Sequence, residues 1–562
     1  MDNVELMWEN NILKTISSFI TSLGLIVCII VLGFLSVGSL VCSFLESYTK
    51  LSETGDLYTF LTKQEILLAA ILGVVILFLI SIFLLKIKKV NWKIVLLLSV
   101  VITFVVQMWW ILGQHTNGTW YSDAKQLLNY AEALSNGKKD LYFNSSLPDN
   151  MSDMYTGTLY FVNYPYQLGG FAFYYLLYVT FHSSAPLVFQ IINAVVNALT
   201  IVTLSFSAST FLKTNGQKIL NVVLLTVFIP NLMYSSFMYC NQVGFFLASI
   251  FIMLQTFSLS SNSNKKAISY AVISFIPYAL MCWIKLTFCI IAIAFIILWI
   301  IKLFSNRTSK NLLCTIFCAL IFFGGNYSTN LPIKYMEDKI GYSFGKGIPK
   351  TAWIAMGLQD TEREGTVSYP GWWNSYTNDL QVQTNNDYDE MSELSIESIK
   401  SSLLYFMKNP GYTVNFLVQK ISSEWFVPDF NAHYFSAINY YTNENGDNVQ
   451  FTVSSEEYPS VKKTEYDQMW SVINIVDTFM DGYQSFIYIF SLIGVISLFR
   501  HRKELDAKYV TFPCIFILGF VLYVIWEAKA QYVMPFFMCL IPVSVMGLKE
   551  ITNRFITKTE KI

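Results

Sequence analysis

Twelve stretches of this sequence are apolar for about the length of a membrane-crossing helix, and this feature constrains the fold most strongly. About 20 apolar residues span the hydrocarbon core of a bilayer. Of 562 residues, 54% are hydrophobic and 13% are charged, whereas soluble domains average about 25% charged residues. The sequence therefore predicts an all-α polytopic membrane protein. The predicted spans are 15–43, 66–86, 93–113, 185–212, 218–236, 243–259, 267–282, 285–303, 311–325, 482–499, 509–526 and 533–549.

Lysine and arginine gather in alternate turns between these spans. Short loops rich in these residues stay on the cytoplasmic side, so we expect both termini and all of these turns to be cytoplasmic. The opposite side then receives two long polar segments, 114–167 and 327–480. The basic turns are 86–93, 213–218, 265–266, 302–310, 500–503 and 549–561.

A further apolar run, 168–181, is short for a membrane span. If it crossed in addition to 185–212, Lys213 and Lys218 would move to the outer side. Counting basic residues favours a single crossing, so we expect 168–181 to be a re-entrant or interfacial helix. The total is then about twelve spans, or thirteen if this segment also crosses.

The first long polar segment contains the first candidate site residue, Asp123. Ala124, Leu127, Leu128, Ala131 and Leu134 follow it at helical spacing. This pattern predicts an amphipathic helix, which can lie in the membrane interface, with Asp123 at its N-terminal end. The aspartate is either a catalytic carboxylate or a helix cap, since Ser and Asp both suit the N-cap position.

Further polar groups occur at the same predicted end of the spans. Charged groups near membrane depth are energetically costly and usually functional. The alternatives are structural: Lys285 snorkels to lipid headgroups, Lys529 pairs with Glu527, and Asn241 caps the following helix. The groups are Tyr239, Asn241 and Gln242 in one short loop, Lys285 at the mouth of a span, and Glu527, Lys529, Gln531 and Tyr532 in the last outer turn.

Four regions follow from this reading of the chain. They are an N-terminal two-helix addition (1–92), a transmembrane core with its long loop (93–326, loop 114–170), a mixed soluble outer domain (327–480) and C-terminal spans with a cytoplasmic tail (481–562). All nine cysteines lie in or beside apolar segments, so no disulfides staple the outer domain. A net charge of −1 without basic runs indicates no nucleic-acid partner.

Short motifs in these segments resemble those of the C-type glycosyltransferase superfamily of membrane enzymes. The resemblance is to the protein O-mannosyltransferases and the lipid A aminoarabinose transferases in particular. It covers most of 93–550 and leaves the first two spans as an addition. The motifs are YSDAKQLL (121–128), NYPYQLGG (163–170), IKLTF (284–288), IPKTAWIAMGL (348–358) and EAKAQYVMP (527–535).

The resemblance implies a sugar donor linked to polyprenyl phosphate and an acceptor that is a glycan, a lipid or a protein. It implies no obligate cofactor, names no metal ligand and leaves a divalent cation open. Asp123 would be the catalytic base. The donor phosphate would be bound by Lys285, Lys529, Gln531 and Tyr532, and the substrates by Trp120, Tyr121, Tyr164, Pro165, Gln167 and Asn241.

A single carboxylate base without a covalent nucleophile indicates an inverting displacement, because a phosphate leaving group needs no protonation. Two other classes stay open: a polymerase or ligase of lipid-linked oligosaccharides, and a non-enzymatic transporter or flippase. Few arginines and many Asn, Lys, Ile and Tyr residues are typical of an AT-rich bacterial genome. We therefore expect a bacterial plasma-membrane protein with its site on the outer face.

Overall fold

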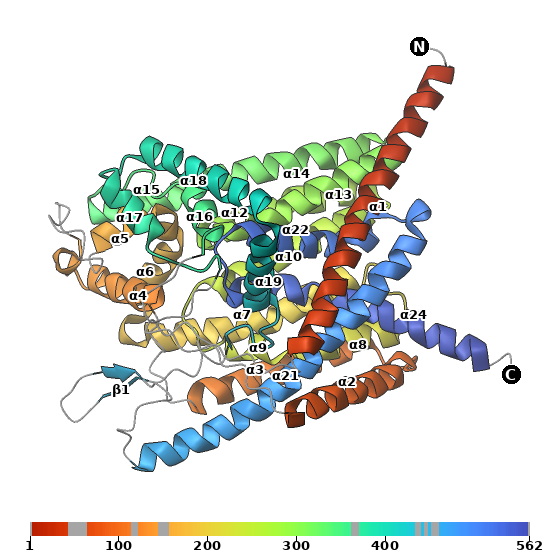
Figure 1. Ribbon diagram of the computed structural model, residues 1–562, viewed down its shortest axis with the longest axis horizontal. Helices are drawn as coiled ribbons and strands as arrows, with labels where there is room; N and C mark the ends of the chain where they lie inside the picture. Colours follow the sequence, from red (N-terminus) through yellow and green to blue (C-terminus); the bar gives the residue numbers. More distant parts are fainter. Residues whose placement is uncertain are drawn as a thin grey trace.

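The computed structural model describes residues 3–42, 64–113, 122–143, 157–360, 370–432, 440–442, 448–450 and 460–559. Within these ranges the chain is almost entirely helical (Figure 1). The exception is one short antiparallel pair, β1 (Tyr440–Thr442) with β2 (Asn448–Gln450), in which Tyr441 lies opposite Val449. The all-α class predicted from the apolar runs is confirmed to this extent.

Nine helical runs among the described residues are long and apolar enough to cross a membrane. They agree with nine of the twelve predicted spans. The helices that form them are α1 (Asn3–Cys42), α3 (Trp92–Gly113), α6 (Leu168–Phe181) with α7 (Ala185–Ala208), α10 (Asn241–Ser260), α11 (Asn264–Ile273) with α12 (Phe275–Ile284), α13 (Ile290–Ser305), α14 (Ser309–Ser328) with α15 (Asn330–Ile340), α21 (Ser460–Arg500) and α22 (Thr511–Ile525).

The other three predicted spans differ in form. The span 218–236 is wrong as a single helix, because α8 (Asn215–Thr226) ends before α9 (Ile229–Met233) begins. Pro230 cannot continue the hydrogen-bond ladder, and it disfavours helical backbone just before it. The span 533–549 bends by 48° between α23 (Ala530–Met538) and α24 (Ile541–Thr559). In α2 (Gln64–Leu85) the described apolar part is short, at 71–85.

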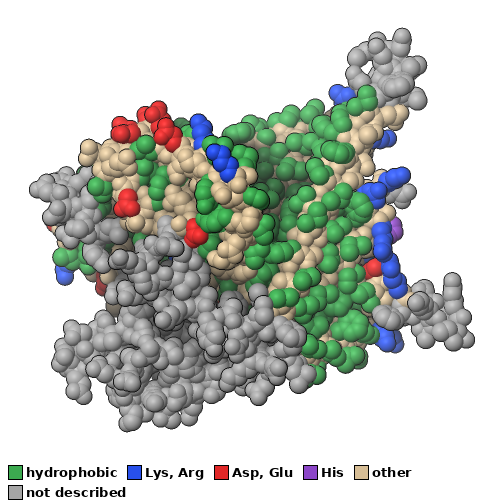
Figure 2. Space-filling model, viewed as in Figure 1, with side chains coloured by type: hydrophobic (Ala, Val, Ile, Leu, Met, Phe, Trp, Pro, Cys, Tyr) green, Lys and Arg blue, Asp and Glu red, His purple; other side chains and the backbone are tan. Residues whose placement is uncertain are grey.

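The basic turns of the sequence lie together at one end of the bundle. Figure 2 shows lysine and arginine along one edge, next to a broad hydrophobic band, while acidic side chains gather on the opposite side. This arrangement agrees with a bilayer across the band and with the predicted grouping of the turns. The joining contacts are Asn215 Nδ2 to Lys88 O (3.2 Å), Lys310 Nζ to Ser261 O (3.1 Å) and Lys302 Nζ to Asp506 Oδ1 (3.3 Å).

The helices α6 and α7 form one run of 44 residues, Pro165–Ala208, but the run is not straight. The rings of Tyr174 in α6 and Phe189 in α7 stack with centroids 5.2 Å apart. Fifteen residues along a straight helix would separate them by about 22 Å. The chain therefore turns sharply at His182, which has φ +51°. The run is therefore two helices, α6 and α7, that fold back on each other.

The predicted outer domain has a small core of its own but is not separate from the bundle. Its helices are α16 (Lys350–Gly357), α17 (Tyr376–Gln383), α18 (Tyr388–Lys408) and α19 (Pro410–Trp425). The buried residues of the small core are Ile348, Ala352, Trp353, Met356, Leu380 and Met391. The segment 425–432 is buried and leaves this region for the bundle, where Gln484 Nε2 donates to Val427 O at 3.2 Å. Within the predicted mixed soluble outer domain, 327–480, this segment packs against the bundle.

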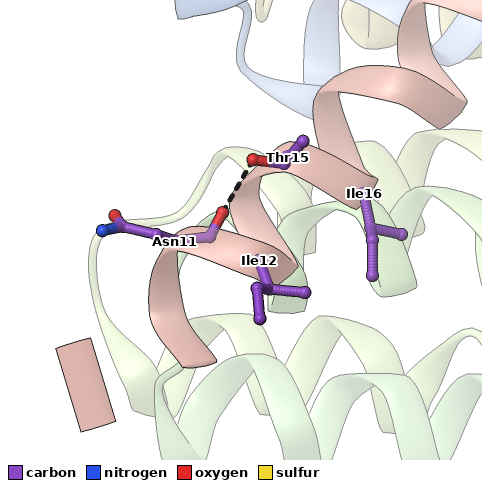
Figure 3. A pocket seen from close by; sticks show the side chains of 4 residues that line it. All are labelled: Asn11, Ile12, Thr15 and Ile16. Atoms are coloured by element: carbon purple, nitrogen blue, oxygen red, sulfur yellow. Dashed lines mark hydrogen bonds between the residues drawn. The ribbon is translucent and has the colours of Figure 1, made fainter. Parts of the chain in front are cut away.

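The N-terminal region is likewise joined to the rest of the bundle. Ser17 Oγ in α1 donates to Ile301 O in α13 at 3.0 Å, and Ser485 Oγ in α21 donates to Ser39 Oγ at 3.1 Å. A shallow hollow near the start of α1 is lined by Asn11, Ile12, Thr15 and Ile16 (Figure 3). One turn of a single helix forms it, and its only drawn hydrogen bond is local, from Thr15 to Asn11 O.

The arrangement of the two ends generates a labelling prediction. Glu397 lies exposed on α18, and Lys503 lies exposed in the basic turn after α21. In intact cells, a membrane-impermeant thiol reagent should label Glu397→Cys and leave Lys503→Cys unlabelled, because basic turns are expected on the cytoplasmic side. The parent protein gives the background from native cysteines. Equal labelling of both variants would contradict the topology.

Candidate functional site

Lys285 lies where α12 ends and a short 3-10 helix, η4 (Leu286–Cys289), begins. Its backbone is extended, and its N–H still bonds to Met281 O at 2.7 Å. Two glycines bring neighbouring helices close to this point. A Cβ on Gly169 of α6 would lie 1.9 Å from Trp283 O, and one on Gly244 of α10 would lie 2.8 Å from Lys285 Cβ. Side chains at these glycines would push the helices away from Lys285.

Two tyrosine rings face the ammonium group of Lys285. Its Nζ lies 4.6 Å from the ring centroid of Tyr239 and 5.4 Å from that of Tyr532. Aromatic faces attract cations, more strongly when water is excluded. Gln167 Nε2 donates to the Tyr239 hydroxyl at 2.8 Å and so fixes that ring. Four of the predicted site segments, represented by Gln167, Tyr239, Lys285 and Tyr532, therefore meet here.

The charges around Lys285 act on each other. Burial lowers the pKa of Lys285 to about 8, and Lys529 adds to this lowering. Cys240, Asp123 and Glu527 oppose it. Lys285 is surrounded by protein, but part of its surface stays accessible to a molecule the size of water. The predicted carboxylate and both predicted lysines thus share one electrostatic environment.

Asp123 is the second residue of α4 (Ser122–Ser135), and its side chain is half-buried. The helix predicted from the apolar spacing is confirmed, with Ala124, Leu127, Leu128 and Ala131 all buried. By these bounds Asp123 lies in the first turn of the helix, where an acid favours the helix dipole. Burial raises the pKa of Tyr164, and the Asp123 carboxylate raises it further.

The end of the long loop is held by the outer region. Ile348 N–H donates to Asn163 O at 3.0 Å, and Gln381 Nε2 donates to Asn163 Oδ1 at 2.6 Å. The rings of Tyr164 and Trp353 lie 5.9 Å apart. A Cβ on Gly347 would lie 2.3 Å from Pro165. Tyr164 and Pro165 therefore join the site to the outer helices, whereas Trp120 and Tyr121 lie outside the described residues.

Polar side chains are also buried at the start of α10 and around the start of α23. Glu527, Gln531 and Asn241 are each only 7% exposed. Among the described atoms, neither Gln531 Oε1 nor Asn241 Oδ1 has a hydrogen-bond partner. Asn241 is the first residue of α10, and its side chain does not cap that helix. Buried oxygens of this kind are available for a substrate donor group.

Two charged residues at the site were not predicted from the sequence. Lys420 and Glu424 on α19 are both fully buried. Lys420 Nζ donates to Gly357 O at 2.5 Å and to Trp526 O at 2.7 Å, and so fixes the turn that precedes Lys529. Their spacing of four residues in a polar helix is typical of an exposed ion pair, so no signal in the sequence indicated burial.

Glu424 has an unusual environment. Burial raises its pKa well above the usual range, while Lys420 and the backbone of Lys529 lower it and Glu527 raises it. The Lys529 amide is the backbone donor that approaches it, and no described group meets full hydrogen-bond geometry with either carboxylate oxygen. Lys420 therefore holds the turn that precedes Lys529, and Glu424 lies buried beside it.

The described residues contain no group of three or more His, Cys, Asp or Glu side chains placed to hold a metal ion. No protein-family model matches the chain, and no curated protein matches it in sequence. The side chains of the site include the carboxyl groups of Asp123, Glu424 and Glu527, the lysines Lys285, Lys420 and Lys529, and several tyrosines.

The close contact at Gly169 generates a stability prediction with a matched control. A methyl group there would press into the Trp283 carbonyl, whereas the nearest atom to a Cβ on the adjacent Gly170 is 3.5 Å away. Overpacking costs about 1–3 kcal/mol. Gly169→Ala should lower the apparent melting temperature of the purified protein, and Gly170→Ala should leave it nearly unchanged. Equal melting temperatures would show that α6 does not pack against Trp283.

Proposed function

We propose that this protein is a membrane glycosyltransferase that moves a sugar from a polyprenyl-phosphate donor to an acceptor. The observation that carries the proposal is that the charges of Asp123 and Lys529 both act on Lys285, at the end of α12. The resemblance of the same segments to C-type glycosyltransferases supports it. The acceptor is a cell-surface glycan, a cell-wall polymer, a lipid or a protein, and the site faces the outside of a bacterial plasma membrane.

The chemistry follows from the charges. An acceptor hydroxyl oxygen attacks the anomeric carbon, and the bond from this carbon to the phosphate oxygen breaks. The phosphate leaves with the bonding electron pair, and the Lys285 ammonium stabilises the developing charge. Asp123 takes the proton of the acceptor hydroxyl as general base. Attack and departure on opposite faces invert the anomeric configuration.

The position of the charges argues against a transporter or flippase. Transporters place their ionisable groups near the bilayer midplane, at the interface of structural repeats. Here Lys285 lies at the end of α12, and the outer helices hold the neighbouring turn through Lys420. Incubating the purified protein with a prenyl-phosphate sugar separates the classes. A transferase consumes the donor in the presence of acceptor, and a transporter leaves it intact.

Replacing the base tests the role of Asp123. Asp123→Asn keeps the size of the side chain and its ability to accept a hydrogen bond, but it removes the proton acceptor. Turnover should fall by about 100-fold or more, with donor binding unchanged. Glu132→Gln, on an exposed position of the same helix, should behave like the parent. Near-parental turnover of Asp123→Asn would exclude Asp123 as the base.

The pKa of Lys285 generates a pH prediction. With a pKa of about 8, this lysine is an ammonium below pH 8 and neutral above it. Because the donor phosphate needs the cation, kcat/KM should fall as the pH rises through about 8. Lys285→Arg keeps its charge at alkaline pH, so its alkaline limb should move upward. Lys400→Arg, on an exposed lysine, should keep the parental profile.

Removing the charge tests the same contact more directly. Lys285→Ala should lower kcat/KM roughly ten- to a hundred-fold, as loss of a charge-assisted contact costs about 1.5–3 kcal/mol. An alkaline limb that is the same in the parent and in Lys285→Arg would show that another group binds the phosphate.

A further inference from the structure

The helices α18 and α19 form a hairpin whose tip carries apolar side chains that nothing covers in the described chain. Asn409 and Pro410 join the two helices, and the rings of Phe406 and Phe416 pack between them at 5.0 Å. Met407 is 72% exposed and Val414 is 62% exposed. Four more exposed side chains extend the same surface. We call all six the hairpin tip: Leu403, Leu404, Tyr405, Met407, Val414 and Val418.

The hairpin is anchored at the depth of the membrane. At the end of α19, the Trp425 ring lies 5.5 Å from that of Phe516 in α22, and the Tyr488 hydroxyl donates to Trp425 O at 2.8 Å. Phe516 precedes the last residue of α22, Ile525, by nine residues, or about 14 Å along a helix. One end of α19 therefore lies well inside the bundle.

The direction of α19 keeps the hairpin near this depth. In Figure 1, α19 runs crosswise to the spans α13 and α14 instead of continuing their direction. A helix that leaves the bundle crosswise stays near the membrane surface, whereas a helix parallel to the spans would carry its far end away from the bilayer. The exposed tip of the hairpin is thus brought beside the lipid.

Basic and acidic side chains lie at different ends of α18, a pattern that is typical of a helix at a membrane surface. Lys400 and Lys408 are exposed beside the tip, while Glu390, Glu393 and Glu397 are exposed on the other half of α18. Figure 2 shows this region with acidic side chains at the far edge and basic ones nearer the hydrophobic band. Lysines next to apolar side chains bind lipid headgroups while their stems stay in the apolar layer.

We propose that the hairpin tip inserts into the bilayer leaflet at the end of the bundle that bears Asp123. The occupant of this surface is lipid, because the hairpin continues from a segment packed against the spans and its lysines flank the apolar side chains. This inference goes beyond sugar transfer and does not depend on it. The region between α14 and α21 is then a monotopic membrane element as well as an outer cover.

Lipid quenching of a fluorescent label tests the proposal in the full-length protein in phosphatidylcholine nanodiscs. A thiol-linked fluorophore is placed at Met407→Cys or Val414→Cys, with the labelled parent as the blank. Nanodiscs that contain lipids with a nitroxide near the headgroup should quench both labels, and aqueous iodide should not. Leu320→Cys, an exposed position within the span α14, is the lipid control, and Glu393→Cys is the aqueous control.

Two outcomes would overturn the proposal. Quenching of the Met407 and Val414 labels by iodide alone, as expected for Glu393→Cys, would place the tip in water. Quenching by neither reagent would show that protein, such as a second copy of the chain, covers the tip. Because the readout is fluorescence and not turnover, failure of the proposed sugar transfer would leave this result unaffected.

Discussion

The burial of one ammonium group is the constraint on which the candidate site depends. Removing a charge from water is costly unless other groups replace the hydration. At Lys285 the faces of Tyr239 and Tyr532 and the carboxylates of Asp123 and Glu527 do so. The pKa of Lys285 still falls to about 8, so these groups replace the lost hydration only in part. A phosphate that entered this environment would supply the missing negative charge, which is why we read the cluster as a phosphate site.

The outer helices form part of this site. Lys420 donates to the carbonyls of Gly357 and Trp526, and Ala528 N–H donates to Gly371 O at 2.8 Å. A Cβ on Gly357 would lie 2.6 Å from the Trp526 carbonyl, so α16 packs directly on the turn that precedes Lys529. The turn before α23 is thus held by contacts from α16, from α19 and from Gly371. Changes in the outer helices should affect the site at a distance.

Much of this arrangement could be predicted because it depends on simple physical rules. Apolar length predicted most spans, helical periodicity predicted α4, and the side on which basic turns gather predicted that Asp123, Lys285 and Lys529 share an end. The rest depends on tertiary contacts. The break between α8 and α9 follows from Pro230, but an apolar run conceals it. The burial of Lys420 and Glu424 and the entry of 425–432 into the bundle have no counterpart in local pattern, because partners far along the chain create them.

The central claim is that the cluster around Lys285 binds the phosphate of a prenyl-phosphate lipid. A structure of the full-length protein with a short-chain polyprenyl phosphate bound tests it most directly. The account predicts a phosphate oxygen within hydrogen-bond distance, about 3 Å, of Lys285 Nζ, near the rings of Tyr239 and Tyr532 and on the side that faces Asp123. A phosphate bound at the basic turns, with Lys285 still facing only the tyrosines, would contradict it.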